Sequence, residues 1–103
     1  MSQPDADGTA ILRTGRANHW RGGITDGGRL TLTADQLRFQ PHRVNFDGGE
    51  ALSLPLSELE AVTVGSRIFE ILVSLRGGGQ EKFVVYKRAA WLADIDKARG
   101  QIR

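Results

Sequence analysis

The stretch Gly27-Gly-Arg-Leu-Thr-Leu-Thr-Ala-Asp-Gln-Leu-Arg-Phe39 decides the fold. Its large apolar residues recur at every second position: Leu30 and Leu32 before Ala34-Asp35, and Leu37 and Phe39 after it. Because side chains alternate between the two faces of a strand, this spacing predicts two strands that each bury one face and expose the other.

Similar alternation continues along the chain, in residues 52–56, 62–64, 68–76 and 82–86. In the third of these segments we expect the buried face to carry Phe69, Ile71, Val73 and Leu75, and the opposite face to carry Glu70, Ser74 and Arg76. Pro55 has no N–H to donate, so its strand is expected at an edge or to end there. Glycine-rich stretches at 22–28, 47–49 and 77–79 are interpreted as turns, which predicts about six or seven consecutive antiparallel strands.

The last segment changes its period. Trp91, Ile95, Ala98 and Ile102 are spaced four, three and four residues apart, which predicts one amphipathic helix that starts near Arg88 and can end at Gly100. The fold class is therefore mainly β, a barrel with a single C-terminal helix. Such a helix can plug the open end of a barrel, and we expect the Trp91 ring to fill that opening.

Length and composition limit the possible functions. The chain has 103 residues, a formal net charge of +2 and no cysteine. This length suits one domain, which we place at residues 9–103 after a disordered tail at residues 1–8. The charge is weak for a nucleic-acid binder, and a chain without cysteine has no disulfide, no thiolate metal site and no cysteine nucleophile. We find no signal peptide and no membrane-spanning run, and expect a cytoplasmic protein.

Several of these segments together resemble the GRAM domain family. The resemblance covers roughly residues 16–98. The family's G-x-L-x-L-T strand is matched by Gly28–Thr33, and its next strand by Leu37-Arg38-Phe39. The passage Leu54-Pro-Leu-Ser-Glu-Leu-Glu-Ala-Val62 is similar to a later family motif. Further matches are Trp20, Pro41-His42, Asn45, Phe83, Trp91 and Ile95.

The resemblance implies a pleckstrin-homology-like fold. In that fold two near-orthogonal antiparallel sheets of about seven strands form a partly open barrel, capped by a C-terminal helix. It also implies a binding module that has no catalysis and no cofactor, and that associates with protein partners or membrane lipids. The localisation expected from it is cytoplasmic, including the inner membrane surface. Likeness of fold alone is an associational argument for function.

Basic residues are the first candidates for a site. Lipid-binding pleckstrin-like domains use cations in their first hairpin, and here Arg21 and Arg29 flank a predicted hairpin with Asp26 at its tip. Lys87 and Arg88 precede the helix, whose free N–H groups can hold an anion. The candidate lipid or anion-binding residues are therefore Arg21, Arg29, Lys87 and Arg88. The alternative is that these basic residues form a solvated surface that binds no specific ligand. A phosphate loop is rejected, because Gly28 stands where that motif needs lysine.

The two histidines are the remaining candidates. His19 and His42 lie on different predicted strands that can approach across the sheet, so they are candidate metal ligands or catalytic bases. The alternative is packing and hydrogen bonding near Trp20 and Asn45. No nucleophile elbow or metal-ligand spacing accompanies them, and we do not expect an enzyme or a metal site. No aromatic stripe for stacking nucleic acid is expected either.

Three hypotheses follow. The first is a module for protein–protein interaction or self-association, which includes a homo-oligomer paired through an edge strand near Leu52. The second is a peripheral membrane module that binds anionic lipid or phosphoinositide headgroups. The third is a small enzyme or metal protein that uses His19 and His42.

Overall fold

The computed structural model describes residues 10–21, 23–42 and 51–101. The predicted tail at residues 1–8, the turn at 47–49 and the helix residue Ile102 lie outside these ranges. Within them the chain forms strands, one short 3-10 turn and one α-helix, in the following order: β1 (Ile11–Arg21), β2 (Ile24–Thr33), β3 (Gln36–Pro41), β4 (Leu52–Pro55), η1 (Leu56–Glu58), β5 (Leu59–Val64), β6 (Glu70–Leu75), β7 (Gln80–Val85) and α1 (Arg88–Gly100).

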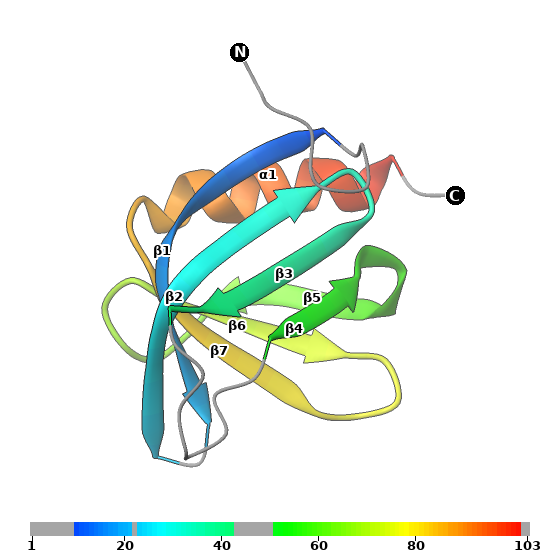
Figure 1. Ribbon diagram of the computed structural model, residues 1–103. Helices are drawn as coiled ribbons and strands as arrows, with labels where there is room; N and C mark the ends of the chain where they lie inside the picture. The colour runs from blue at the N-terminus through cyan, green and yellow to red at the C-terminus, as the bar shows by residue number, and fades with distance from the viewer. Residues whose placement is uncertain (1–9, 22, 43–50, 102–103) are drawn as a thin grey trace.

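The strands form one antiparallel sheet in the order β4-β3-β2-β1-β7-β6-β5. This confirms the predicted mainly β architecture with a C-terminal helix. Strand β1 belongs to both halves of the sheet. It pairs with β2 along its length and with β7 through Ala17–Trp20, so the two predicted sheets are hydrogen-bonded into one. Figure 1 shows the sheet curling round, with α1 across one end.

The alternating residues build the core as predicted. Leu30, Leu32, Leu37 and Phe39 point inward and are almost completely buried. Trp91, Ile95 and Ala98 of α1 close the same core from one end. The other core residues are Ala17, Leu56, Leu59, Ile71, Val73, Phe83 and Val85. Within the described ranges, no helix is both long and apolar enough to span a membrane.

Two predicted details at the glycine-rich stretches need correction. Gly27 and Gly28 are not in a turn but lie inside β2, where they pair with Asn18 and Ala17 of β1. Asp26 is therefore not at a hairpin tip: it sits opposite His19 and is buried. The three glycines at 77–79 do form a turn, and all three have positive φ angles that favour glycine.

The start of β6 also differs from the prediction. Phe69 precedes the strand, has φ 64° and is half exposed, whereas Glu70 is only 1% exposed. The backbone at Phe69 is left-handed, which interrupts the alternation and turns the two side chains away from their expected faces. From Ile71 to Leu75 the alternation is as predicted.

Candidate functional site

The four predicted anion-binding residues lie on different parts of the fold. Arg21 ends β1, and its side chain lies outside what the structure describes. Arg29 is in the middle of β2, directly opposite Arg16. Lys87 and Arg88 are at the start of α1. Arg29 therefore lies inside a strand and does not flank the turn between β1 and β2.

Arg88 has a structural partner in the loop that joins β5 to β6. Its guanidinium Nη1 donates to the carbonyl oxygens of Arg67 (3.2 Å) and Glu70 (3.3 Å). Hydrogen bonds from a charged donor are among the stronger ones. Arg88 therefore ties the loop at 65–69 to the start of the helix.

The two histidines face opposite sides of the sheet. His19 points inward and is 4% exposed; its ring stacks on Phe83, and its Nε2 lies 2.6 Å from a carboxylate oxygen of Glu81. His42 is exposed and lines a hollow on the outer face. The structure therefore does not bring the two imidazoles together. The described residues contain no group of three His, Asp or Glu residues placed to hold a metal ion.

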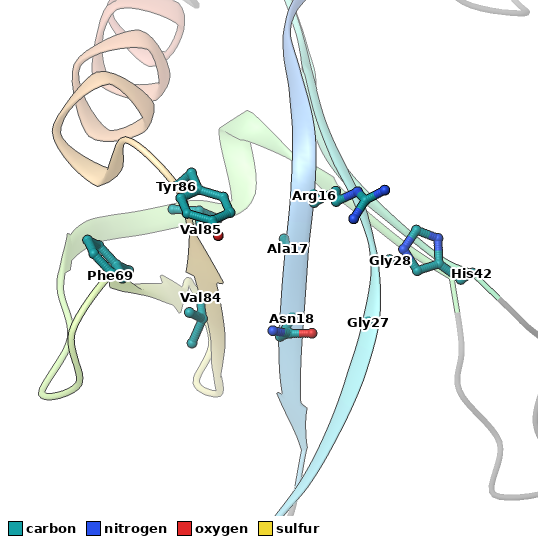
Figure 2. Close-up of a pocket in the computed structure, with 10 residues that line it drawn as sticks. All are labelled: Arg16, Ala17, Asn18, Gly27, Gly28, His42, Phe69, Val84, Val85 and Tyr86. Carbon is teal, nitrogen blue, oxygen red and sulfur yellow. The ribbon is translucent and has the colours of Figure 1, made fainter.

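A groove of about 390 Å³ crosses the outer face of β1. Figure 2 shows aromatic side chains on one side of β1 and basic ones on the other. Residues from β1, β2, β7 and the segments that flank β3, β6 and α1 form it: Arg16, Ala17, Asn18, Gly27, Gly28, His42, Phe69, Val84, Val85 and Tyr86.

The two glycines of β2 have different roles at this groove. A Cβ atom on Gly28 would point inward, 2.7 Å from the Phe39 ring and 2.8 Å from the Pro41 backbone, so the packing of β2 on β3 requires glycine. A Cβ on Gly27 would point outward, between Asn18 Oδ1 (3.3 Å) and the His42 ring (3.7 Å). Gly27 therefore leaves the floor of the groove bare.

Phe69 and Tyr86 form the aromatic wall. Their ring centroids are 6.3 Å apart, and the side chains are 50% and 75% exposed. The left-handed backbone of Phe69 is rare for a bulky residue. Its carbonyl oxygen accepts a 2.8 Å hydrogen bond from the Val85 N–H, which secures the strained residue to the end of β7.

The rest of the loop is held equally firmly. Gly65 N–H donates to the Glu70 carbonyl (2.9 Å), and the Arg67 guanidinium lies 4.0 Å from the centroid of the Trp20 ring. A side chain on Gly65 would collide with the buried Glu70 carboxylate. These contacts over-determine the conformation of the loop, and strain of this kind is typical of functional sites.

Arg16 and His42 form the basic wall. The backbone N–H of His42 donates to the Gly27 carbonyl oxygen (3.0 Å), and this hydrogen bond holds His42 beside Gly27 at the floor of the groove. Figure 2 shows the Arg16 side chain extending from β1 toward His42. The groove thus presents hydrogen-bond donors and positive charge on one side and apolar rings on the other.

Sequence reasoning missed this groove because it assigned Phe69 to the core. One signal was visible: the alternation in 82–86 places Tyr86 on the polar face, where an aromatic residue is unusual. Arg16 was visible as one of several arginines along the first strand, but nothing in the sequence shows that it faces His42.

Comparison with known proteins supports the fold. No family model and no curated protein matches the sequence. Among solved structures, the C-terminal domain of an unknown protein from Leishmania infantum superposes with a TM-score of 0.78 at 15% identity, covering 92% of this chain and 88% of that one. The Slm1 PH domain in complex with phosphoserine gives 0.70 at 16% identity, covering 88% and 97%.

The DH/PH domains of p115-RhoGEF give a TM-score of 0.78 at 13% identity, covering 96% of this chain but only 33% of that one. The present chain therefore spans about a third of that protein fragment. Identities this low relate the folds alone, and the fold is that of a pleckstrin-homology domain.

Proposed function

We propose that this chain is a non-catalytic binding module of the GRAM type, and that it recognises a protein partner through the groove over β1. One observation carries the proposal: two exposed aromatic side chains, one of them on a strained residue, form the wall of an open groove. Buried aromatic and arginine anchors dominate the binding energy of protein interfaces, and both residue types line this groove.

Two further observations support the assignment. The segments that resemble the GRAM family coincide with β2, β3 and the passage from β4 through η1 to β5. In addition, the described lining of the groove includes one imidazole but no carboxylate, thiol or aliphatic hydroxyl group. Such a set suits recognition better than nucleophilic or acid–base catalysis.

Binding of displayed random peptides to the full chain tests the proposal. We expect selected peptides to shift the amide resonances of Asn18, Gly27 and Val84, which lie along the groove. Tyr86→Ala should weaken their binding about tenfold, as is usual for an aromatic anchor. The control is Leu12→Ala, which removes an exposed apolar side chain near the far end of α1. The proposal is contradicted if the peptides shift resonances outside the groove, or if Tyr86→Ala leaves their affinity unchanged.

The second candidate function is peripheral binding to an anionic membrane. The observation that favours it is an exposed Ile68, which lies in the chain between Arg67 and the groove residue Phe69. Co-sedimentation with neutral and anionic vesicles at low and high salt separates the two functions. Salt-sensitive binding to anionic vesicles alone, weakened by changes at Arg21, Arg29, Lys87 or Arg88, favours the membrane, because each basic residue near the surface contributes about 1 kcal/mol.

A further inference from the structure

The arginines whose side chains the structure describes fall into two groups. Six of them have partners in the fold. Arg13 pairs with Asp94, and Arg67 with the Glu70 carboxylate, while Arg76, Arg88 and Arg99 donate to carbonyl oxygens and Arg38 has a partner as well. Two others, Arg16 and Arg29, have no ion pair or hydrogen bond from their side chains within the part of the chain that the structure describes.

These two arginines are also neighbours. Arg16 of β1 and Arg29 of β2 are directly opposite in the register, and both are exposed. Like charges in directly opposed positions destabilise a sheet. The fold therefore keeps an unfavourable pair on its surface, which an anion bound between the two guanidinium groups would convert into a favourable arrangement.

The surroundings of Arg16 extend this anion site into the groove. His42, held by its hydrogen bond to Gly27, adds a ring that can donate a further hydrogen bond. Gly27 contributes no side chain between Asn18 and His42, so a ligand group can approach the strand closely. Figure 2 shows this basic side separated from Phe69 and Tyr86 by the width of β1.

We infer that the protein partner carries a phosphorylated side chain, bound by Arg16, Arg29 and His42, with an apolar residue against Phe69 and Tyr86. This inference rests on the proposed function and names the chemical class of its ligand. A phosphate monoester carries a charge of about −1.5 to −2 and matches two guanidinium groups, whereas one carboxylate leaves a net positive charge. Because the groove is concave and has walls of opposite character, it fits an extended segment better than a membrane surface.

Two synthetic peptide libraries provide the test. They share degenerate flanks around one fixed serine or tyrosine, which is phosphorylated in one library and unmodified in the other. We expect the full chain to bind the phosphorylated library about tenfold more tightly, and Arg16→Ala or Arg29→Ala to remove that advantage. Lys97→Ala, an exposed cation on α1 remote from the groove, is the matched control and should leave it unchanged.

The melting temperature of each variant separates a binding role from a structural one. Removing either member of the like-charged pair should leave the melting temperature unchanged or raise it, while phosphopeptide binding falls. The inference is overturned if the variants melt at a lower temperature and this loss of stability accounts for the loss of binding. That result would show that the two arginines stabilise the fold.

The remaining outcomes distinguish the inference from the proposed function. One outcome is that the two libraries bind equally, with binding weakened by Tyr86→Ala but not by Arg16→Ala. That result overturns the phosphate site and supports the proposed peptide-binding groove. If neither library binds, both the phosphate site and the proposed peptide-binding function are wrong. If phosphatidylcholine vesicles that contain phosphatidylserine or a phosphoinositide bind in an Arg16-dependent way while the peptides do not, the anion belongs to a membrane and the inference is wrong.

Discussion

The imidazole of His19 lies inside the sheet against the rings of Phe39 and Phe83, and its Nε2 lies within hydrogen-bond distance of a Glu81 carboxylate oxygen. Its second ring nitrogen, Nδ1, is buried without a hydrogen bond among the described residues. We assign the Nε2 proton to the hydrogen bond with Glu81, because a carboxylate only accepts. His19 is therefore a buried residue whose side chain has one hydrogen-bond partner among the described residues, Glu81.

Removing that partner should therefore be costly. We predict that Glu81→Ala lowers the free energy of unfolding by about 1–3 kcal/mol, because a buried polar ring then lacks its hydrogen bond. Urea denaturation measures the change. Glu60→Ala, an exposed glutamate on β5, is the control and should change stability by no more than about 0.5 kcal/mol. Equal effects of the two substitutions would show that the buried hydrogen bond contributes nothing.

The adjacent glycines of β2 offer a second test at the residue scale. Gly28→Ala places a Cβ against the backbone of β3 and should destabilise the protein by about 1–3 kcal/mol, as overpacking does. Gly27→Ala meets only the ends of the Asn18 and His42 side chains, and should be close to neutral for stability. Thermal unfolding of both variants checks the contrast. A reversed order would mean that the two faces of β2 are assigned wrongly.

At the scale of elements, α1 is held to the sheet through Trp91. The ring is buried and packs over Gly15 of β1, 3.7 Å from where a Cβ on that glycine would be. Arg13 approaches the same ring at 5.8 Å and pairs with Asp94 of α1. Arg99 joins the other end of the helix to the carbonyl oxygens of Leu59 and Glu60 in β5.

We predict that Trp91→Ala costs about 3–5 kcal/mol of stability, because it empties the space between helix and sheet. Chemical denaturation gives the value. Trp20→Ala is the comparison, since Trp20 is only partly buried and rests against Arg67 on the other side of β1; it should cost clearly less. A Trp91 variant as stable as the unmodified chain would refute the picture of a helix that closes the barrel.

The loop at 65–69 is tied to α1 by one side chain, that of Arg88. We predict that Arg88→Ala speeds hydrogen exchange of the loop amides and weakens peptide binding in the groove, with little loss of global stability. Hydrogen-exchange mass spectrometry reads the first effect, with Lys97→Ala as control. Unchanged exchange at 66–69 would show that the backbone hydrogen bonds hold the strained Phe69 without Arg88.

At the scale of the whole molecule, residues from both halves of the sheet and from α1 share one core. We propose that residues 9–103 act as one cooperative domain, and we predict a single two-state transition. In a Trp20→Phe variant, Trp91 is the only tryptophan and reports on the docking of the helix, while far-UV circular dichroism reports on the sheet. The two urea curves should coincide. Separate midpoints would mean that α1 undocks before the sheet unfolds.

The predictions from local pattern were correct where the cause is local. The two-residue period of 27–39 predicted that Leu30, Leu32, Leu37 and Phe39 are buried, because alternation of side chains is a property of any extended chain. The spacing of Trp91, Ile95 and Ala98 predicted the buried stripe of α1 for the corresponding helical reason. The short β4, which stops at Pro55 at one end of the strand order, follows from the missing N–H of proline.

Predictions failed where the cause lies in contacts between distant segments. Glycine content indicated a turn at Gly27-Gly28, but the close approach of β3 to β2 requires Gly28 within a strand. Phe69 and Glu70 exchanged their expected environments because Arg88 and Val85, far along the chain, hold the loop in a left-handed conformation. Asp26 is buried because pairing with β1 extends β2 to Ile24, and alternation then turns Asp26 to the same face as Leu30.

The sequence by itself thus determined most of the strands, the helix, many of the residues that form the core and the mainly β architecture with a C-terminal helix. Only the tertiary structure decided where a ligand can bind. The groove joins Arg16, His42, Phe69 and Tyr86, and the opposition of Arg16 to Arg29 depends on strand register. Register and loop packing are set by pairing across the whole sheet, so no local pattern in the chain records them.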